Sequence, residues 1–354
     1  MHKKNKLKES VIKKRGEYKV VLGVCVSGPP KYWALALVTL ISLKKHLNIS
    51  PSRILIATDQ KDEFACFQKF ENNFESKFER VVPRSFYKKI FPKMKGNFAA
   101  YWKFDLFQSL SDDEILIYLD VDAFAISNIN VANIINIFNC GQYKLAAVPS
   151  QRPVLERVSA TQINNPFDYF NTGVLFGIKD QRYEKTNIEK AYHSIIKYDT
   201  LNLIWHDQDI FNIQFRNETF KLPYAYNVHT GYLVKNFRTP FLLNGLAAQD
   251  IKEKTIIAHV SGDFLFSKKF HPHKHQFSKL IKTCIEILEA NKYFDKSRKI
   301  EMQAAMQKLL INAKKNNIDY FLQSIYMRKR LFDNNYYFSS CKSFLRRIKH
   351  SIHL

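Results

Sequence analysis

Two aspartates, Asp120 and Asp122, stand directly after an apolar run at 115–119, and their types and spacing could bind a divalent cation. The run has the composition of a strand that is buried on both faces. In an open α/β sheet, ligands bind beyond the carboxyl ends of the strands. Two carboxylates at such an end can hold a hard cation that also takes phosphate oxygens. A pair of turn-forming or helix-capping aspartates is the ordinary alternative, because this spacing is common.

Three later segments carry further polar residues beside apolar runs. Asn171 precedes an apolar run that starts at Gly173, and His259 lies in another run that is followed by Gly262. Between them, acids and amides gather beside an aromatic residue in the segment WHDQDIFN at 205–212. Taken singly, these residues have ordinary structural roles, as a turn residue, the start of a helix and a buried imidazole. Their order along the chain, more than any one segment, favours a functional interpretation.

Strands that alternate with helices must position these residues. Short apolar and β-branched runs predict strands at 18–26, 54–57, 114–119, 144–148, 173–178 and 255–260. Longer segments predict helices at 32–46, about 60–80 and 101–110. The alternation favours an α/β domain with a mostly parallel sheet. We expect a basic segment at 1–17, this domain at 18–263, and a basic, aromatic and helical region at 264–354.

The ordered segments resemble motifs of the retaining glycosyltransferases of family 8, and above all the bacterial lipopolysaccharide galactosyl- and glucosyltransferases. Lys103 ends a Tyr-Trp-Lys triplet, and sixteen residues separate it from Asp120, as in the Y-x-R and LYLDxD block of that family. Four further segments match family motifs, namely FNTGVL at 170–175, DQDIFN at 207–212, LPYAYN at 222–227 and AHVSG at 258–262. The resemblance covers about 18–263 and implies a GT-A fold, which is Rossmann-like, with a mostly parallel sheet flanked by helices.

The resemblance also implies a metal site and a nucleotide-sugar donor. Asp120, Asp122 and His259 would bind Mn²⁺ or Mg²⁺, and the ion would neutralise charge on the diphosphate of a UDP-sugar. An imidazole beside two carboxylates suits Mn²⁺ better than Ca²⁺.

The same resemblance implies which residues surround the donor sugar. Asp207 and Gln208 are the expected catalytic residues, and Gln208 would lie on the sugar face opposite the departing diphosphate. A neutral amide is a poor covalent nucleophile, so front-face attack by the acceptor hydroxyl is the expected route to retention. Lys103 stands where the family usually has Arg. The lysine ammonium is a point charge, so the forked contact of an arginine guanidinium is lost. The expected donor-binding residues are Lys103, Asp120, Asn171, Asp207 and Gly262.

Two departures from the family pattern remove contacts that would be expected to bind the nucleotide. The first turn, at 26–30, reads VSGPP and lacks the Asp-x-Asn-Tyr that holds the nucleoside. Six residues after His259 stands Leu265, where the family has a phosphate-binding lysine. Lys268 or Lys269 is the candidate replacement.

The positive charge of the protein is concentrated at its two ends. The 354 residues include 55 Lys and Arg against 32 Asp and Glu, which gives a net charge of +23. Residues 1–19 carry +6 and residues 264–354 carry +13, whereas the body between them carries +4. At 338–352 apolar residues recur at spacings of three or four with Lys and Arg between them, as in an amphipathic helix that binds an anionic membrane surface. The alternative is a helical subdomain that packs its aromatic residues on the catalytic body.

The sequence favours a cytoplasmic enzyme. The basic N-terminal segment has no apolar core of a signal peptide, and the apolar run at 32–43 is shorter than the ~20 residues that span a bilayer. Five scattered cysteines form no C-x-x-C motif, which favours a reducing compartment.

Together these features predict a retaining hexosyltransferase, peripheral on the inner face of the plasma membrane. It would move galactose or glucose from a UDP-sugar to a lipid-linked glycan such as lipopolysaccharide or lipooligosaccharide. One alternative is a sugar nucleotidyltransferase, but the Gly-rich N-terminal loop of that class is absent. Another is a basic nucleic-acid-binding protein, which would leave the ordered motifs unused, so no nucleic-acid partner is expected.

Overall fold

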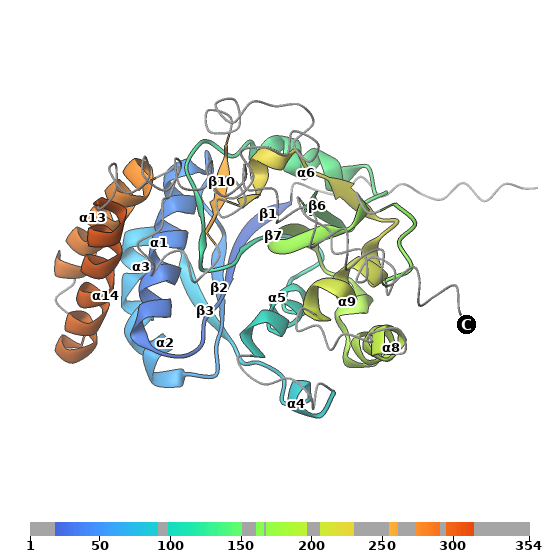
Figure 1. Ribbon diagram of the computed structural model, residues 1–354, viewed down its shortest axis with the longest axis horizontal. Coiled ribbons are helices and arrows are strands. Elements are labelled where there is room, and N and C mark those ends of the chain that lie inside the picture. Colours follow the sequence, from blue (N-terminus) through green and yellow to red (C-terminus); the bar gives the residue numbers. More distant parts are fainter. Residues whose placement is uncertain are drawn as a thin grey trace, which may run out of the picture.

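A computed structural model describes most of the chain that precedes residue 315. The residues described are 18–90, 98–150, 161–165, 168–196, 206–229, 255–260, 274–290 and 295–314. Among them, helices cover both faces of a central sheet, and a further pair of helices forms an outer layer on one side (Figure 1). This α/β architecture is the one that the sequence predicted. Gly262, Lys268, Lys269 and the segment 338–352 lie outside the described residues.

The central sheet has seven strands in the order β3-β2-β1-β4-β7-β6-β8. Every pairing is parallel except the two made by β7, so the prediction of a mostly parallel sheet is confirmed. Each residue of β4 is buried, as its continuous apolar run requires. The bounds are Lys19–Cys25 for β1, Arg53–Ala57 for β2, Lys77–Val81 for β3, Glu114–Leu119 for β4, Leu145–Pro149 for β6, Phe170–Ile178 for β7 and Thr219–Lys221 for β8.

The reversed direction of β7 brings two predicted site segments together. Because β7 is antiparallel to β4, its first residues lie beside the carboxyl end of β4, with Leu119 paired to Val174. The backbone N–H of Asp120 donates to the carbonyl oxygen of Gly173 at 2.8 Å. Asn171 therefore reaches the ligand-binding edge of the sheet from the start of its strand, not from the end.

A small second sheet carries His259 to the same edge. It has the order β5-β10-β9, with β5 at Ala123–Ala125, β9 at Val228–His229 and β10 at Ile257–His259. His259 pairs with Ala123 in the antiparallel ladder of β10 and β5. The backbone N–H of Val260 also donates to the carbonyl oxygen of Asp122 at 2.8 Å. The predicted strand at 255–260 thus exists, but it belongs to this second sheet.

The helices form on both faces of the central sheet (Figure 1). The first of them, α1, begins directly after Pro29, with Pro30 as a helical residue that needs no backbone N–H. Lys44 and Lys45 in its last turn complement the negative end of the helix dipole. The bounds are Pro30–His46 for α1, Lys61–Phe67 for α2, Glu71–Phe74 for α3, Tyr87–Ile90 for α4, Lys103–Gln108 for α5, Val131–Asn139 for α6, Lys185–Ile196 for α8 and His206–Phe215 for α9.

Two helices of the predicted C-terminal region form the outer layer against α1. They are α13 at Lys274–Ala290 and α14 at Lys296–Lys314. Their buried residues belong to the same core cluster as the apolar face of α1, and include Ile281, Cys284, Leu288 and Met306. The helical character expected of this region is therefore present over the described part, and it packs on the body. Among the described helices, none combines the length and the apolar composition needed to cross a membrane. The domain boundaries at 17/18 and 263/264 stay predictions.

Candidate functional site

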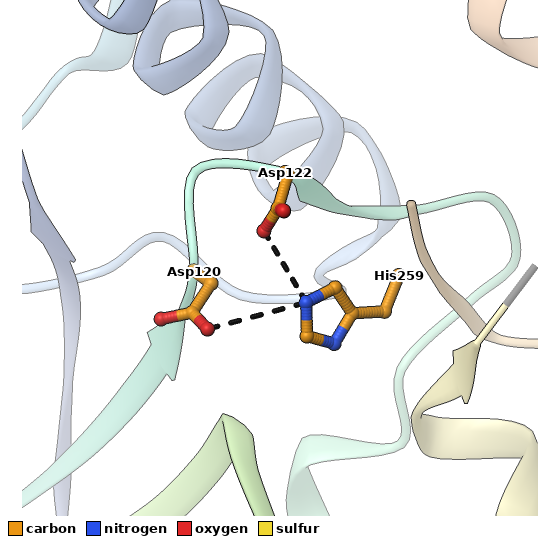
Figure 2. Close-up of side chains that lie close together, drawn as sticks. All are labelled: Asp120, Asp122 and His259. Carbon is orange, nitrogen blue, oxygen red and sulfur yellow. Dashed lines mark ion pairs between the residues drawn. The ribbon is translucent and has the colours of Figure 1, made fainter. Parts of the chain in front are cut away.

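Asp120, Asp122 and His259 come together at the carboxyl end of β4. The Nε2 atom of His259 lies 3.2 Å from Oδ1 of Asp122 and 4.0 Å from Oδ2 of Asp120 (Figure 2). One potential ligand atom from each side chain lies within 4.8 Å of the others. The three residues that the family resemblance assigns to a cation thus form one cluster.

Local backbone geometry explains how this cluster forms. Asp120 and Asp122 are the first and third residues of a tight turn between β4 and β5, closed by the N–H of Ala123, which donates to the carbonyl oxygen of Asp120 at 2.9 Å. Gly173 makes room for the imidazole, since a Cβ atom at this position would lie 2.1 Å from Cε1 of His259. The same Cβ would lie 3.0 Å from Oδ2 of Asp120. Position 173 therefore excludes any side chain while the cluster keeps this shape.

The charges and ligand types of the cluster fit a divalent cation. Burial of His259 opposes its protonation, but the carboxylates of Asp122 and Asp120 outweigh burial and raise the pKa of the imidazole above its ordinary value. A positive charge is therefore favoured at this position. Two carboxylates and one imidazole are ligands that Mn²⁺ accepts.

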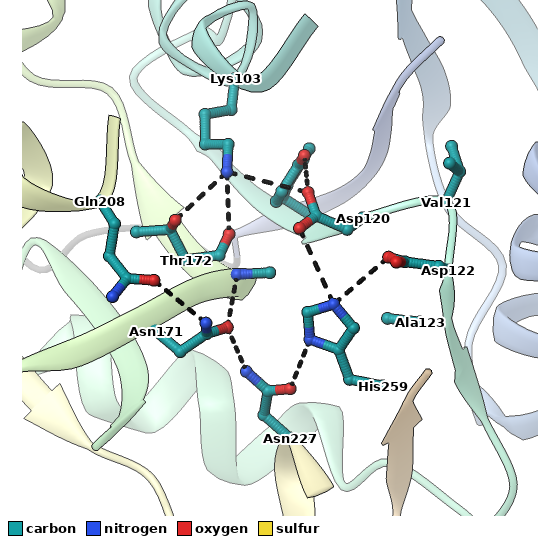
Figure 3. A network of polar contacts seen from close by, with 12 residues as sticks. Lys103, Asp120, Val121, Asp122, Ala123, Asn171, Thr172, Gln208, Asn227 and His259 are labelled. Carbon is teal, nitrogen blue, oxygen red and sulfur yellow. Dashed lines mark hydrogen bonds and ion pairs between the residues drawn. The ribbon is translucent and has the colours of Figure 1, made fainter. Parts of the chain in front are cut away.

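Lys103 lies beneath the cluster and connects three elements of the fold. Its Nζ atom, on the first residue of α5, is 3.0 Å from Oδ2 of Asp207 and 3.8 Å from Oδ1 of Asp120 (Figure 3). It also donates to the carbonyl oxygen and the hydroxyl of Thr172, at 3.2 and 3.3 Å. Burial alone would lower the pKa of Lys103, but the two aspartates raise it above its ordinary value. The ammonium is thus charged and orients both acids, and its contact with a donor stays a prediction.

The two oxygens of Asp120 have different partners. Oδ1 accepts a hydrogen bond from the hydroxyl of Tyr118 and faces Lys103, whereas Oδ2 faces His259. Burial, and next the charge of Asp120, raise the pKa of Tyr118 well above its ordinary value, so its hydroxyl stays protonated as a donor. Because Tyr118 and Lys103 hold Oδ1, Oδ2 of Asp120 is directed into the cation cluster.

The residues expected around the donor sugar also gather in one place. Asp207 and Gln208 lie in the first turn of α9, where the helix dipole favours a carboxylate. The hydroxyl of Thr172 donates to Oδ2 of Asp207 at 3.2 Å, and Nδ2 of Asn171 donates to Oε1 of Gln208 at 3.0 Å. Asn212 fixes α9 against β7 through reciprocal hydrogen bonds of 2.8 Å with the backbone of Phe170.

Asn227 is a site residue that the sequence reasoning did not single out. It follows a short 3-10 helix, η5, at Tyr224–Tyr226, and its side chain lies between His259 and Asn171 (Figure 3). Its Oδ1 atom is 3.0 Å from Nδ1 of His259, and its Nδ2 atom donates to Oδ1 of Asn171 at 2.8 Å. The available signal was its place as the last residue of LPYAYN.

Solved structures with the same fold include several glycosyltransferases. Galactosyltransferase LgtC, in complex with donor and acceptor sugar analogs, superposes with a TM-score of 0.54 at 14% identity, over 75% of this chain and 95% of that one. The bifunctional glycosyltransferase WbbM gives 0.54 at 15%, over 77% of this chain but only 51% of that one. GlyE of Streptococcus pneumoniae gives 0.51 at 18%, over 80% of this chain and 64% of that one. At these identities the likeness concerns the fold.

Comparison with protein families is more specific. No curated protein matches the sequence. The sequence model of glycosyl transferase family 8, however, matches residues 24–265. This span contains the cation cluster and the residues around the expected sugar site. Because this match covers most of the chain and nearly the whole predicted catalytic domain, the protein belongs to glycosyl transferase family 8.

Proposed function

We propose that this glycosyltransferase moves a hexose, galactose or glucose, from a UDP-sugar to a glycan acceptor with retention of configuration. One observation carries the proposal. The acids and histidine suited to a cation, and the amides and acid expected around a sugar, lie in a single hydrogen-bonded network at the carboxyl edge of the sheet. A donor that has both a diphosphate and a sugar fits such a pair of neighbouring sites.

The cation half of the network would bind the diphosphate. Asp120, Asp122 and His259 would hold Mn²⁺ or Mg²⁺, which when bound supplies a charge that neutralises the donor diphosphate. Tyr118 and Lys103 keep Asp120 oriented through its other oxygen. These contacts thus fix the orientation of Asp120 before an ion binds.

The sugar half would orient the hexose for transfer. Asn171, Asp207 and Gln208 would hydrogen-bond the sugar, with the Gln208 dipole beside an anomeric carbon that develops positive charge. The acceptor hydroxyl would attack on the face from which the nucleotide departs. The new bond joins the acceptor oxygen to the anomeric carbon, the bond from that carbon to the phosphate oxygen breaks, and the hydroxyl proton passes to the departing phosphate. This route gives retention without a covalent bond to Gln208.

A panel of donors tests this assignment. Full-length protein with MnCl₂ is incubated with UDP-, GDP- and CMP-sugars, and slow donor hydrolysis is measured without an acceptor. We expect turnover of UDP-galactose or UDP-glucose, and its loss in Asp122→Asn. Asp113→Asn is the matched control, because Asp113 lies just before the opposite end of β4 in an exposed ion pair with Lys19. Full hydrolysis by Asp122→Asn, or turnover of GDP- or CMP-sugars alone, would contradict the proposal.

We further propose that the acceptor is a lipid-linked glycan, such as lipopolysaccharide or lipooligosaccharide, and that the enzyme works at the inner, cytoplasmic face of the plasma membrane. Support comes from the net charge of +13 over residues 264–354 and from the amphipathic pattern at 338–352. Each basic residue near an anionic leaflet contributes about 1 kcal/mol of binding. The four basic residues of that segment would therefore contribute about 4 kcal/mol to peripheral attachment.

Sedimentation with anionic vesicles tests the membrane proposal. The full-length variant with glutamine at Lys342, Arg346, Arg347 and Lys349 is expected to bind more weakly by up to roughly a thousandfold. A control variant makes the same change in charge at exposed lysines of the body, namely Lys45, Lys61, Lys179 and Lys190. Equal sedimentation of the two variants would contradict attachment through the C-terminal segment.

A further inference from the structure

A continuous chain of hydrogen bonds joins the cation cluster to the sugar site through three side-chain amides (Figure 3). Nδ1 of His259 lies 3.0 Å from Oδ1 of Asn227, and Nδ2 of Asn227 donates to Oδ1 of Asn171 at 2.8 Å. Nδ2 of Asn171 then donates to Oε1 of Gln208 at 3.0 Å. The four residues come from β10, the end of η5, β7 and α9, so the chain crosses both sheets.

One backbone group sets the direction of this whole chain. A side-chain amide can present either its oxygen or its nitrogen, and its orientation follows from a partner whose role is fixed. The N–H of Gly173 can only donate, and it lies 2.8 Å from Asn171, which must therefore present Oδ1. That oxygen also faces Asn227, so Asn227 must present its NH₂ group there and direct its own oxygen toward His259.

The direction of the chain determines which nitrogen of His259 carries a proton. Because Asn227 offers an oxygen, Nδ1 of His259 is a donor whether the ring is charged or neutral, so the proton that a bound cation would displace is the one on Nε2. Nε2 is the atom that faces Asp120 and Asp122. A histidine that binds a metal through one nitrogen almost always donates its other N–H to a fixed acceptor. The amide of Asn227 supplies such an acceptor.

We propose that Asn227 is a positioning residue that holds His259 in the Nδ1–H form and so makes Nε2 available as a ligand. The inference rests on the proposed cation site and goes beyond it by assigning a residue that makes no contact with the ion. Asn227 is 1% exposed and His259 is 6% exposed. Bulk water therefore cannot easily replace the lost acceptor. Through Asn171 the same chain orients Gln208, so one backbone N–H aligns both halves of the site.

The direct test is the affinity of the full-length protein for Mn²⁺ alone, measured by the electron paramagnetic resonance signal of free Mn²⁺ during a titration with MnCl₂. Asn227→Ala removes the acceptor and is expected to weaken binding about 10- to 100-fold. Asn227→Asp keeps an oxygen toward Nδ1–H, although its second oxygen meets Oδ1 of Asn171 in place of the NH₂ group, so its affinity is expected to lie clearly above that of Asn227→Ala. This conservative variant rescues binding only if the hydrogen bond is what matters.

Two controls separate positioning from general loss of structure. Asn130→Ala also removes an asparagine, here the exposed N-cap of α6, whose side chain accepts from the N–H of Asn133. It is expected to lose about 1 kcal/mol of stability and no affinity for Mn²⁺. Long-range ¹H–¹⁵N spectra of neutral His259 provide a second readout, with the Nδ1–H form expected in the wild type and in Asn227→Asp but depleted in Asn227→Ala.

The outcomes distinguish this inference from the proposed function. If the wild type does not bind Mn²⁺, the proposed cation site itself fails. If the wild type binds Mn²⁺ and Asn227→Ala binds it equally well, the role of Asn227 is overturned while the proposed function stands. Equal losses of affinity in Asn227→Ala and Asn227→Asp would also overturn it, because the retained acceptor would then have no effect.

Discussion

The two ends of β4 carry polar clusters of opposite character. At the amino end, Arg53 forms a bidentate pair with Glu114, at 2.9 and 2.6 Å, and also binds Glu79, which Lys77 approaches at 3.4 Å. Two acids there meet two bases, and the cluster is balanced. At the carboxyl end, three aspartates meet one lysine and one histidine.

This difference separates a structural cluster from a functional one. Balanced pairs are satisfied by the fold itself, whereas a surplus of carboxylates at a partly open position needs a further positive charge. The side chains of Asp120 and Asp122 remain 33% and 18% exposed, which leaves a path for an ion. The surplus of negative charge, more than the presence of charged residues, marks the carboxyl end as the candidate cation site.

The largest effect is expected from Asp120→Asn. Loss of a carboxylate that directs Oδ2 into the cluster should lower the rate of sugar transfer on the order of 10²–10³-fold. Stability should stay equal or rise, since the change reduces repulsion among the aspartates. Transfer assays and urea unfolding check both parts. A clear loss of stability together with an unchanged rate of sugar transfer would contradict the proposed difference between the two ends of β4.

In Lys103→Met, thermal stability should depend more strongly on bound Mn²⁺ than it does in the wild type. Asp207 and Asp120 would lose the ammonium, and removal of one partner of a buried pair costs about 3 kcal/mol. Because the surplus negative charge then grows, MnCl₂ should raise the Tm of the variant more than that of the wild type. An equal or smaller rise in the variant would show that the carboxyl end does not respond to charge as proposed.

Arg53→Met is the converse change at the amino end. It leaves Glu114, whose carboxylate is 8% exposed, with the N–H of Ser111 as a donor but without its cationic partner, so the free energy of unfolding should fall by about 2–3 kcal/mol. The affinity for Mn²⁺ should be unchanged, because the two clusters lie at opposite ends of the strand. A loss of affinity in this variant would argue against their independence.

Gly173→Ala should give the smallest of these effects. The added Cβ atom forces His259 away from its place, and we expect the affinity for Mn²⁺ to fall about tenfold, as for other losses of ligand orientation. Gly141→Ala is the matched control, since Gly141 has a φ of +74° but no atom within 4 Å of an added Cβ. It should lose stability and keep its affinity for Mn²⁺. Unchanged affinity in Gly173→Ala would mean that His259 tolerates displacement.

The carboxyl-end acids could be predicted from sequence because the signal is local. A continuous apolar run at 115–119 that ends in Asp120 identifies a buried strand and its ligand-binding end. The reversal of β7 could not be predicted, since a strand buried on both faces has the same apolar pattern in either direction.

Two residues show why the rest of the site needed the structure. Lys103 was assigned from its position in a motif, but its burial beneath Asp207 and Asp120 depends on how α5 packs against β4 and α9. Asn227 reaches His259, 32 positions away, only because β9 and β10 pair side by side. No local pattern encodes such a contact.

The most direct test of the central claim is a calorimetric titration of MnCl₂ into the full-length wild type, the double variant Asp120→Asn with Asp122→Asn, and Arg53→Met. We predict one bound Mn²⁺ per chain for the wild type and for Arg53→Met, and none for the double variant. Equal binding by all three proteins, or loss of binding in Arg53→Met alone, would contradict the assignment of the cation site to the carboxyl end of β4.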